Sequence, residues 1–166
     1  MNEDLKALLD ANIKVIPLRR GDKIPAISGW QQKASCDYSQ IEEWMKQYPG
    51  CNWGMPTGEI NGLIVIDIDT HGGDGINSLR EWCKENGKFP FTLCQKTPTG
   101  GYHLIYRSNN ADLRNRARTN GVEGVDVRWK GGQVVVCPST RSMGAYVWLT
   151  KEQTLAELEG ILEGGN

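Results

Sequence analysis

The apolar run that leads into Asp67 constrains the fold of this chain more than any other segment. It begins with Leu63–Ile66 and continues through Ile68, and Asp69 follows directly. A short run of mostly β-branched residues is typical of a buried strand. Alternation along such a strand directs Asp67 and Asp69 to one face, about 6.5 Å apart, and the isoleucines to the other. The fold must therefore bury this strand and accommodate two carboxylates at its end.

Two neighbouring carboxylates at the end of a buried strand suit a divalent cation. Their repulsion in an apolar setting is costly unless a cation or hydrogen-bond donors offset it. Hard oxygen ligands select Mg²⁺ or Mn²⁺ rather than zinc. Carboxylates at strand ends also cap helices and anchor loops, so the pair alone leaves metal binding and a structural role equally open. Gly72, Gly73 and Gly75 allow close backbone approach, either to a bound triphosphate and its metal or within a turn.

Length, charge and cysteine content limit the class of protein. The chain has 166 residues, the size of one domain. Its 19 Lys and Arg residues balance 20 Asp and Glu residues, so a polyanion site must be a local patch. Five scattered cysteines without a CxxC pair, and no signal-like N-terminus, indicate reduced thiols in a cytoplasm. The longest apolar run is far below the roughly 18 residues of a membrane span. We expect a cytoplasmic globular protein with no membrane contact.

Periodicity, capping residues and glycine turns predict a mixture of helices and strands. Helices are expected over 3–11, from a capping box at Ser39 to near Pro49, from Asp74 to Gly87, and after a cap at Thr150. Strands are expected over 13–18, 63–69, 91–96, 102–106, 125–128 and 133–137. Glycine turns at 97–101 and 130–132 predict two hairpins, which join 91–96 to 102–106 and 125–128 to 133–137. This order indicates an α+β sandwich.

His103 is a candidate phosphate contact because it lies on a predicted strand directly after Gly100 and Gly101. In a strand-helix-strand-strand unit, this hairpin strand can lie beside the Asp67 strand with His103 on the same side. The imidazole could then donate a hydrogen bond to a phosphate. A structural role is the alternative, and it is the commoner one for a single histidine.

Asp126 and Arg128 alternate onto one face of a later strand. A third carboxylate with a cation two residues on is the pattern that a two-metal nucleotidyl-transfer site needs, since acids bridge the ions and arginine neutralises phosphate charge. The alternative is an ion pair on a solvated face, which contributes little.

The stretch 107–120 is the best local candidate for contact with a nucleic-acid backbone, although such a stretch is usually a solvated loop. It carries Arg107, Arg114, Arg116 and Arg118. Trp30 and Trp129 lie in loop or turn contexts, and stacking on a base is the less favoured interpretation of either one.

Taken together, these segments resemble the bifunctional DNA primase/polymerase (prim-pol) family of the archaeo-eukaryotic primase superfamily. The resemblance covers most of the chain, and its specificity comes from the order of its short motifs. The matching pieces are Ile16–Leu18, Gly21–Pro25, Gly29–Trp30, Asn52–Gly54, Thr57–Gly58, Val65–Asp69, Thr97–His103, Val125–Arg128, Gly131–Gly132 and Pro138–Ser139.

The resemblance implies an α+β fold in one prim-pol domain over 1–166. An RRM-like catalytic core, a mostly antiparallel sheet with packed helices, would span 61–150. A small N-terminal α/β module would occupy 1–60, and a C-terminal helix 151–166.

The resemblance also implies the residues of the site. Asp67, Asp69 and Asp126 would be catalytic and would hold two Mg²⁺ or Mn²⁺ ions, and no zinc is expected. His103 would contact the incoming triphosphate, and Arg128 would assist it. Gly101 stands where relatives often have serine, so Thr99 or the backbone amides of Gly100 and Gly101 are candidates for that contact.

The implied function is template-directed nucleotidyl transfer in phage or plasmid replication. The implied partners are nucleoside triphosphates, a single-stranded DNA template with its primer, and a helicase domain or protein. Two alternatives stay open. One is another metal-dependent transferase or phosphodiesterase that acts on nucleotides, and the other is a non-catalytic nucleic-acid-binding module whose acids are structural.

Overall fold

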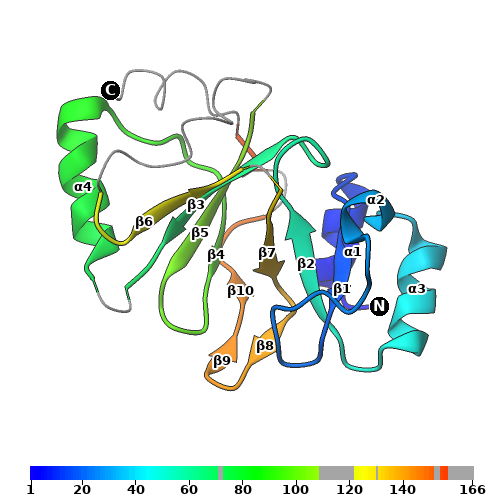
Figure 1. Ribbon diagram of the computed structural model, residues 1–166. Helices are drawn as coiled ribbons and strands as arrows, with labels where there is room; N and C mark the ends of the chain where they lie inside the picture. The colour runs from blue at the N-terminus through cyan, green and yellow to red at the C-terminus, as the bar shows by residue number, and fades with distance from the viewer. Residues whose placement is uncertain (71–72, 109–121, 130, 152–153, 157–166) are drawn as a thin grey trace.

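Strand β3 (Leu63–Ile68) lies in the middle of a five-stranded antiparallel sheet and pairs along both of its edges. Its neighbours are β5 (Tyr102–Arg107) and β6 (Val125–Arg128). The sheet has the order β10-β4-β5-β3-β6, with β4 (Leu93–Lys96) and β10 (Val147–Trp148) beyond β5. Figure 1 shows the computed structural model, which describes residues 1–70, 73–108, 122–129, 131–151 and 154–156.

A second, three-stranded antiparallel sheet has the order β1-β2-β7. It consists of β1 (Ile16–Leu18), β2 (Asn52–Pro56) and β7 (Gln133–Val136). A small hairpin of β8 (Thr140–Arg141) and β9 (Gly144–Ala145) follows β7. The helices α1 (Glu3–Asp10), α2 (Trp30–Lys33) and α3 (Tyr38–Gln47) lie around β1 and β2 in Figure 1. The predicted α+β class is confirmed.

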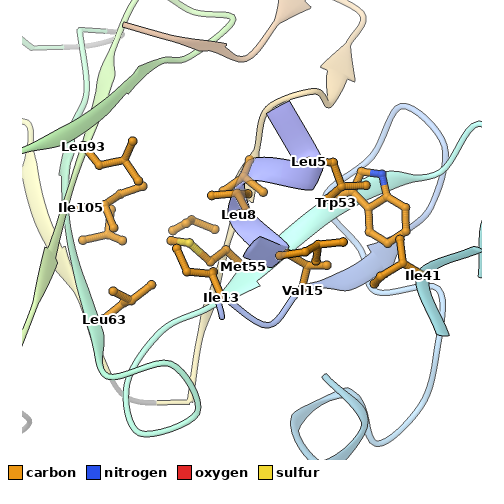
Figure 2. Packing of buried hydrophobic residues seen from close by; sticks show 14 of the residues in the cluster. Leu5, Leu8, Ile13, Val15, Ile41, Trp53, Met55, Leu63, Leu93 and Ile105 are labelled. Carbon is orange, nitrogen blue, oxygen red and sulfur yellow. The ribbon is translucent and has the colours of Figure 1, made fainter. Parts of the chain in front are cut away.

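The main hydrophobic core fills the space between the two sheets. Figure 2 shows Leu63, Leu93 and Ile105 of the five-stranded sheet on one side of this core, with α1 and β2 on the other. Leu5 and Leu8 of α1 are each 1% exposed, because the helix places both on its inward face. This burial of apolar surface holds the two sheets together.

The opposite face of the five-stranded sheet is covered by α4 (Gly75–Asn86). Alternation places Ile64, Ile66 and Ile68 on this face, as the sequence predicts, and all three are buried. Asp74 caps the helix as predicted, because its side chain accepts a hydrogen bond from the Asn77 N–H. The helix ends at Asn86, and Gly87 follows with a φ of +101°, so the predicted stop is confirmed.

None of the helices in the described part of the chain is long and apolar enough to cross a membrane.

The predicted hairpin between 125–128 and 133–137 is wrong. β6 pairs with β3 and β7 pairs with β2, so the two strands belong to different sheets. Val125 and Val127 bury against α4, whereas Val134 and Val136 bury in the core between the sheets. Burial in two separate cores therefore overrides the turn signal.

Two other differences concern the first sixty residues. Helix α3 is capped by Asp37 rather than Ser39, since Asp37 accepts the Ser39 N–H at 2.9 Å. Strand β2 and the short helix α2 were not predicted. Asn, Gly and Pro are depleted in strands, so the composition of β2 gave no strand signal.

The predicted C-terminal helix over 151–166 does not begin at Thr150. Its hydroxyl accepts the Cys94 N–H and donates to the Thr92 carbonyl, so it holds β4 instead of capping a helix. Residues 154–156 are not α-helical, and 152–153 and 157–166 lie outside the described residues.

Most of the predicted arginine-rich loop over 107–120 also lies outside the described residues, from 109 onward. The division into 1–60 and 61–150 stays a prediction. β7, from the second of these segments, completes the sheet of the first.

Replacing Gly75 by alanine should destabilise the protein by about 1–3 kcal/mol, because the new methyl group has no space. A Cβ there would clash with the backbone carbonyl oxygens of Gly124 and Asp69, which cannot move independently of β3 and β6. Urea unfolding measures the loss. Gly73→Ala is the matched control, since its Cβ would make only ordinary contacts with Glu123. Equal stability of the two variants would contradict this packing.

Candidate active site

A row of polar side chains crosses four strands of the five-stranded sheet. Asp67 on β3 lies directly opposite His103 on β5 and directly opposite Asp126 on β6. His103 in turn lies opposite Gln95 on β4. Directly paired residues point to the same face of a sheet, so all four side chains share one face. The predicted placement of His103 and Asp126 beside Asp67 is confirmed.

Asp69 lies one residue past the end of β3 and is exposed. Its N–H donates to the Gly124 carbonyl at 2.7 Å, which continues the contact between β3 and the segment before β6. Its carbonyl accepts the Gly75 N–H at 3.2 Å. The backbone thus brings Asp69 to the same end of the sheet as Asp67 and Asp126.

Asp67 is paired with two nitrogen-bearing side chains. Nε2 of His103 lies 3.4 Å from its Oδ1, and Nη2 of Arg128 donates to its Oδ2 at 3.2 Å. Burial by itself raises the pKa of the Asp67 carboxyl, but hydrogen bonds from His103 and Arg128 and the charge of the Arg128 guanidinium outweigh it. The pKa therefore lies below its ordinary value, and the group is a carboxylate at neutral pH.

The three carboxylates offer the hard oxygen donors that Mg²⁺ and Mn²⁺ prefer. Within the described residues, the side chains as they stand form no group of three or more His, Cys, Asp or Glu residues that could hold a metal ion. His103 and Arg128 each contact one oxygen of Asp67, and a carboxylate has about four lone-pair sites, so each oxygen retains acceptor capacity for a cation. The donor chemistry and the strand register fit a divalent cation.

A cavity of about 270 Å³ opens above Asp67 and His103, between the two sheets. Three cationic side chains from separate segments line it: Lys23 from the loop after β1, Arg128 from β6, and Arg141 from β8. Asp67 is the single carboxylate among its described lining residues. The cavity is therefore locally basic in a chain with a net charge of -1, and it can attract a polyanion.

The turn between β4 and β5 forms one wall of this cavity, to which it contributes Thr97, Pro98 and Thr99. The N–H groups of Gly100 and Gly101 already donate within the turn, to the carbonyl and the hydroxyl of Thr97. Glycine is required at 101 because a Cβ would clash with the Ile68 carbonyl. Of the candidates for the missing serine contact, Thr99 is the one that lines the cavity.

Three residues of the site have no assignment from sequence. Lys23 lies in the segment Gly21–Pro25, which carries the family resemblance, but nothing in that motif indicated that its side chain lines the cavity. Gln95 lies two residues after Leu93 and therefore on the same inward face of its strand. A polar residue at such a position is a signal that it has buried hydrogen-bond partners. Arg141 had no signal, because its place depends on the β8–β9 hairpin.

Two other sequence candidates, Arg107 and Trp129, lie away from the cavity. Arg107 is opposite Leu63, at the other end of β3 from the carboxylates. Trp129 is only 4% exposed and belongs to the core under α4, so it is not available to stack on a base. The remaining arginines of the predicted loop, Arg114, Arg116 and Arg118, lie outside the described residues.

Comparison with known families gives one match. Residues 5–160 match the family described as "Bifunctional DNA primase/polymerase, N-terminal", which covers nearly the whole chain. No curated protein matches the sequence.

Replacing Arg128 by methionine should raise the pKa of Asp67, because the variant loses the positive charge and the hydrogen bond that lower this pKa, while the burial that raises it remains. Carbon-13 NMR titration of the Asp67 carboxyl measures the midpoint. Because the pKa of Asp67 is lower in the folded state than in the unfolded state, its carboxylate stabilises the fold at pH values above the unfolded-state pKa. This stabilisation is lost as the pH falls through the folded-state pKa. The variant should therefore lose that stabilisation at a higher pH than the unmodified protein.

Arg80→Met is the control for this titration, because Arg80 lies on α4 at the opposite face of the sheet. It should leave the midpoint of Asp67 unchanged. An unchanged midpoint in the Arg128→Met protein would show that Arg128 does not hold the Asp67 carboxylate.

Proposed function

Because the chain belongs to the bifunctional DNA primase/polymerase family, whose activity is nucleotidyl transfer of the primase/polymerase type, we propose that it extends a DNA strand by template-directed nucleotidyl transfer. The observation that carries this proposal is the strand register. Asp67 lies opposite both Asp126 and His103, beside a basic cavity. A carboxylate that lines a basic cavity, with a second carboxylate on the neighbouring strand, suits metal-assisted phosphoryl transfer.

Asp67, Asp69 and Asp126 would hold Mg²⁺ or Mn²⁺. When bound, such ions make the attacking 3′-hydroxyl more acidic and offset charge on the leaving pyrophosphate. The carboxylate state of Asp67, favoured by its lowered pKa, keeps it a ligand at neutral pH. Since these acids lie at the ends of paired strands, the sheet itself fixes their spacing.

The triphosphate would lie in the basic cavity. His103 would donate from Nε2 to a phosphate oxygen, and Arg128 would add a charged donor beside it. Lys23 and Arg141 reach the same cavity from other segments, so the phosphates would contact cations on more than one side. This arrangement would orient the α-phosphate toward the carboxylates.

The polymer partners belong to the same proposal. They are a single-stranded DNA template with its primer and a helicase domain or protein, in phage or plasmid replication within a prokaryotic cytoplasm. Family membership supports primase/polymerase-type transfer in general, and these partners and the two-metal mechanism are proposed from that activity together with the strand register.

A non-catalytic nucleic-acid-binding module is the second candidate. The observation that favours it is the pairing of Asp67 with His103 and Arg128, which is also what a structural carboxylate would show. Calorimetric titration with Mn²⁺ and a triphosphate separates the two functions. Joint binding that depends on Asp126 supports the polymerase, and its absence supports the binding module. Another metal-dependent transferase or phosphodiesterase would bind both but would not lengthen a strand.

Asp126→Asn should reduce primer extension by at least about a hundredfold, because the amide removes a charged metal ligand without changing the shape of the side chain. A primer-extension assay with labelled triphosphates measures the rate. Glu43→Gln, an exposed change on α3, is the charge-matched control and should extend normally. Undiminished synthesis by Asp126→Asn would exclude this site as the catalytic one.

Lys23→Met and Arg141→Met should each weaken triphosphate binding by roughly tenfold or more, because each loses a charge-assisted hydrogen bond of about 1.5–3 kcal/mol. Fluorescence titration with a labelled triphosphate in the presence of Mn²⁺ measures the affinity. Lys46→Met, on the exposed last turn of α3, removes the same charge far from the cavity. If all three variants bind alike, the basic cavity is not the triphosphate site.

A further inference from the structure

Gln95 on β4 is fully buried, with 0% of its surface exposed. It lies opposite His103, on the face that carries Asp67. A buried amide is costly unless its donors and its acceptor are hydrogen-bonded. Gln95 meets this requirement with three partners, and two of them are backbone groups of the other sheet and its continuation, Val135 and Cys137.

The two backbone groups fix the orientation of the Gln95 amide. Its Oε1 accepts the Cys137 N–H at 3.0 Å, and its Nε2 donates to the Val135 carbonyl at 2.7 Å. A flipped amide would set an N–H against an N–H and an oxygen against an oxygen. The atom that faces His103 is therefore a nitrogen that can only donate.

This orientation determines which ring nitrogen of His103 carries the proton. Nε2 of Gln95 lies 2.8 Å from Nδ1 of His103, so Nδ1 must accept and cannot itself be protonated. The proton of the neutral ring is then on Nε2, which faces Oδ1 of Asp67 at 3.4 Å. His103 thus presents one N–H donor to the basic cavity.

We propose that Gln95 is a positioning residue that holds His103 in the Nε2–H tautomer and aims this donor at a phosphate oxygen of the bound nucleotide. The identity of the recipient rests on the proposed function, whereas the tautomer does not. Because the bonds of Gln95 run to Val135 and Cys137, the packing of the two sheets sets the angle of the imidazole.

The tautomer can be measured on the unmodified protein without substrate. Long-range proton–nitrogen NMR on histidine-labelled protein distinguishes a bare ring nitrogen from a protonated one, and His103→Asn identifies the signal against that of His71. A bare Nδ1 with a protonated Nε2 is expected. A proton on Nδ1 would overturn the proposal, whatever any variant does. Because no activity is involved, a failed polymerase assay leaves this result unaffected.

Gln95→Met removes the donor while keeping a side chain of similar length. In this variant His103 should become a mixture of tautomers. Gln133→Met changes another glutamine that lines the same cavity but whose amide donates to the Lys23 carbonyl, so it should keep the single tautomer. If His103 keeps the single Nε2–H tautomer in Gln95→Met, then Asp67 rather than Gln95 determines the tautomer, and the proposal is overturned.

A double-mutant cycle separates positioning from a merely structural role. Binding of a non-hydrolysable deoxynucleoside triphosphate with Mn²⁺ should weaken about tenfold in Gln95→Met, and this loss should disappear in a His103→Ala background. Equal losses in both backgrounds would mean that Gln95 acts only by holding Val135 and Cys137, and would overturn the proposal. Circular dichroism selects the variants that are folded.

Discussion

The structure depends on the burial of β3 from both faces while both of its edges are hydrogen-bonded. Leu63 and Val65 face the core between the sheets, and the isoleucines face α4. Beyond Val65 the core between the sheets ends and the cavity begins, so the next side chain on that face, Asp67, can be charged. The position of the carboxylates is thus set by where close packing stops.

The local electrostatics of the site differ from the charge of the whole chain. Lys23, Arg128 and Arg141 are distant in sequence, and only the fold brings them to one cavity. A balanced composition therefore says nothing against a polyanion site. Asp67, the one carboxylate among the described residues that line the cavity, is held charged by its neighbours rather than neutralised by burial. The cavity therefore offers a charged carboxylate that can bind a metal cation, and cationic side chains that can bind phosphates.

The sequence predicted the parts of the site that depend on local pattern. Alternation and the strand-helix-strand-strand order predicted that His103 lies beside Asp67 on one face. The placement of Asp126 beside Asp67 was implied by the family resemblance. The sequence did not predict that β7 leaves β6 for another sheet, because a glycine turn has the same appearance in a hairpin and in a crossover. Gln95 and Arg141 were missed for a related reason: their partners come from segments that only the tertiary structure places beside them.

The pairing of β2 with β7 has a consequence for the order in which the molecule is made. Trp53, in the first third of the chain, pairs with Val136, in the last. Contacts between such distant segments form late, because a long loop must close first. During synthesis β2 therefore keeps one edge unpaired until β7 has emerged from the ribosome, and an open edge invites association with other chains. The three-stranded sheet, whose strands β1 and β2 are translated first, is therefore among the last parts of the molecule to be completed.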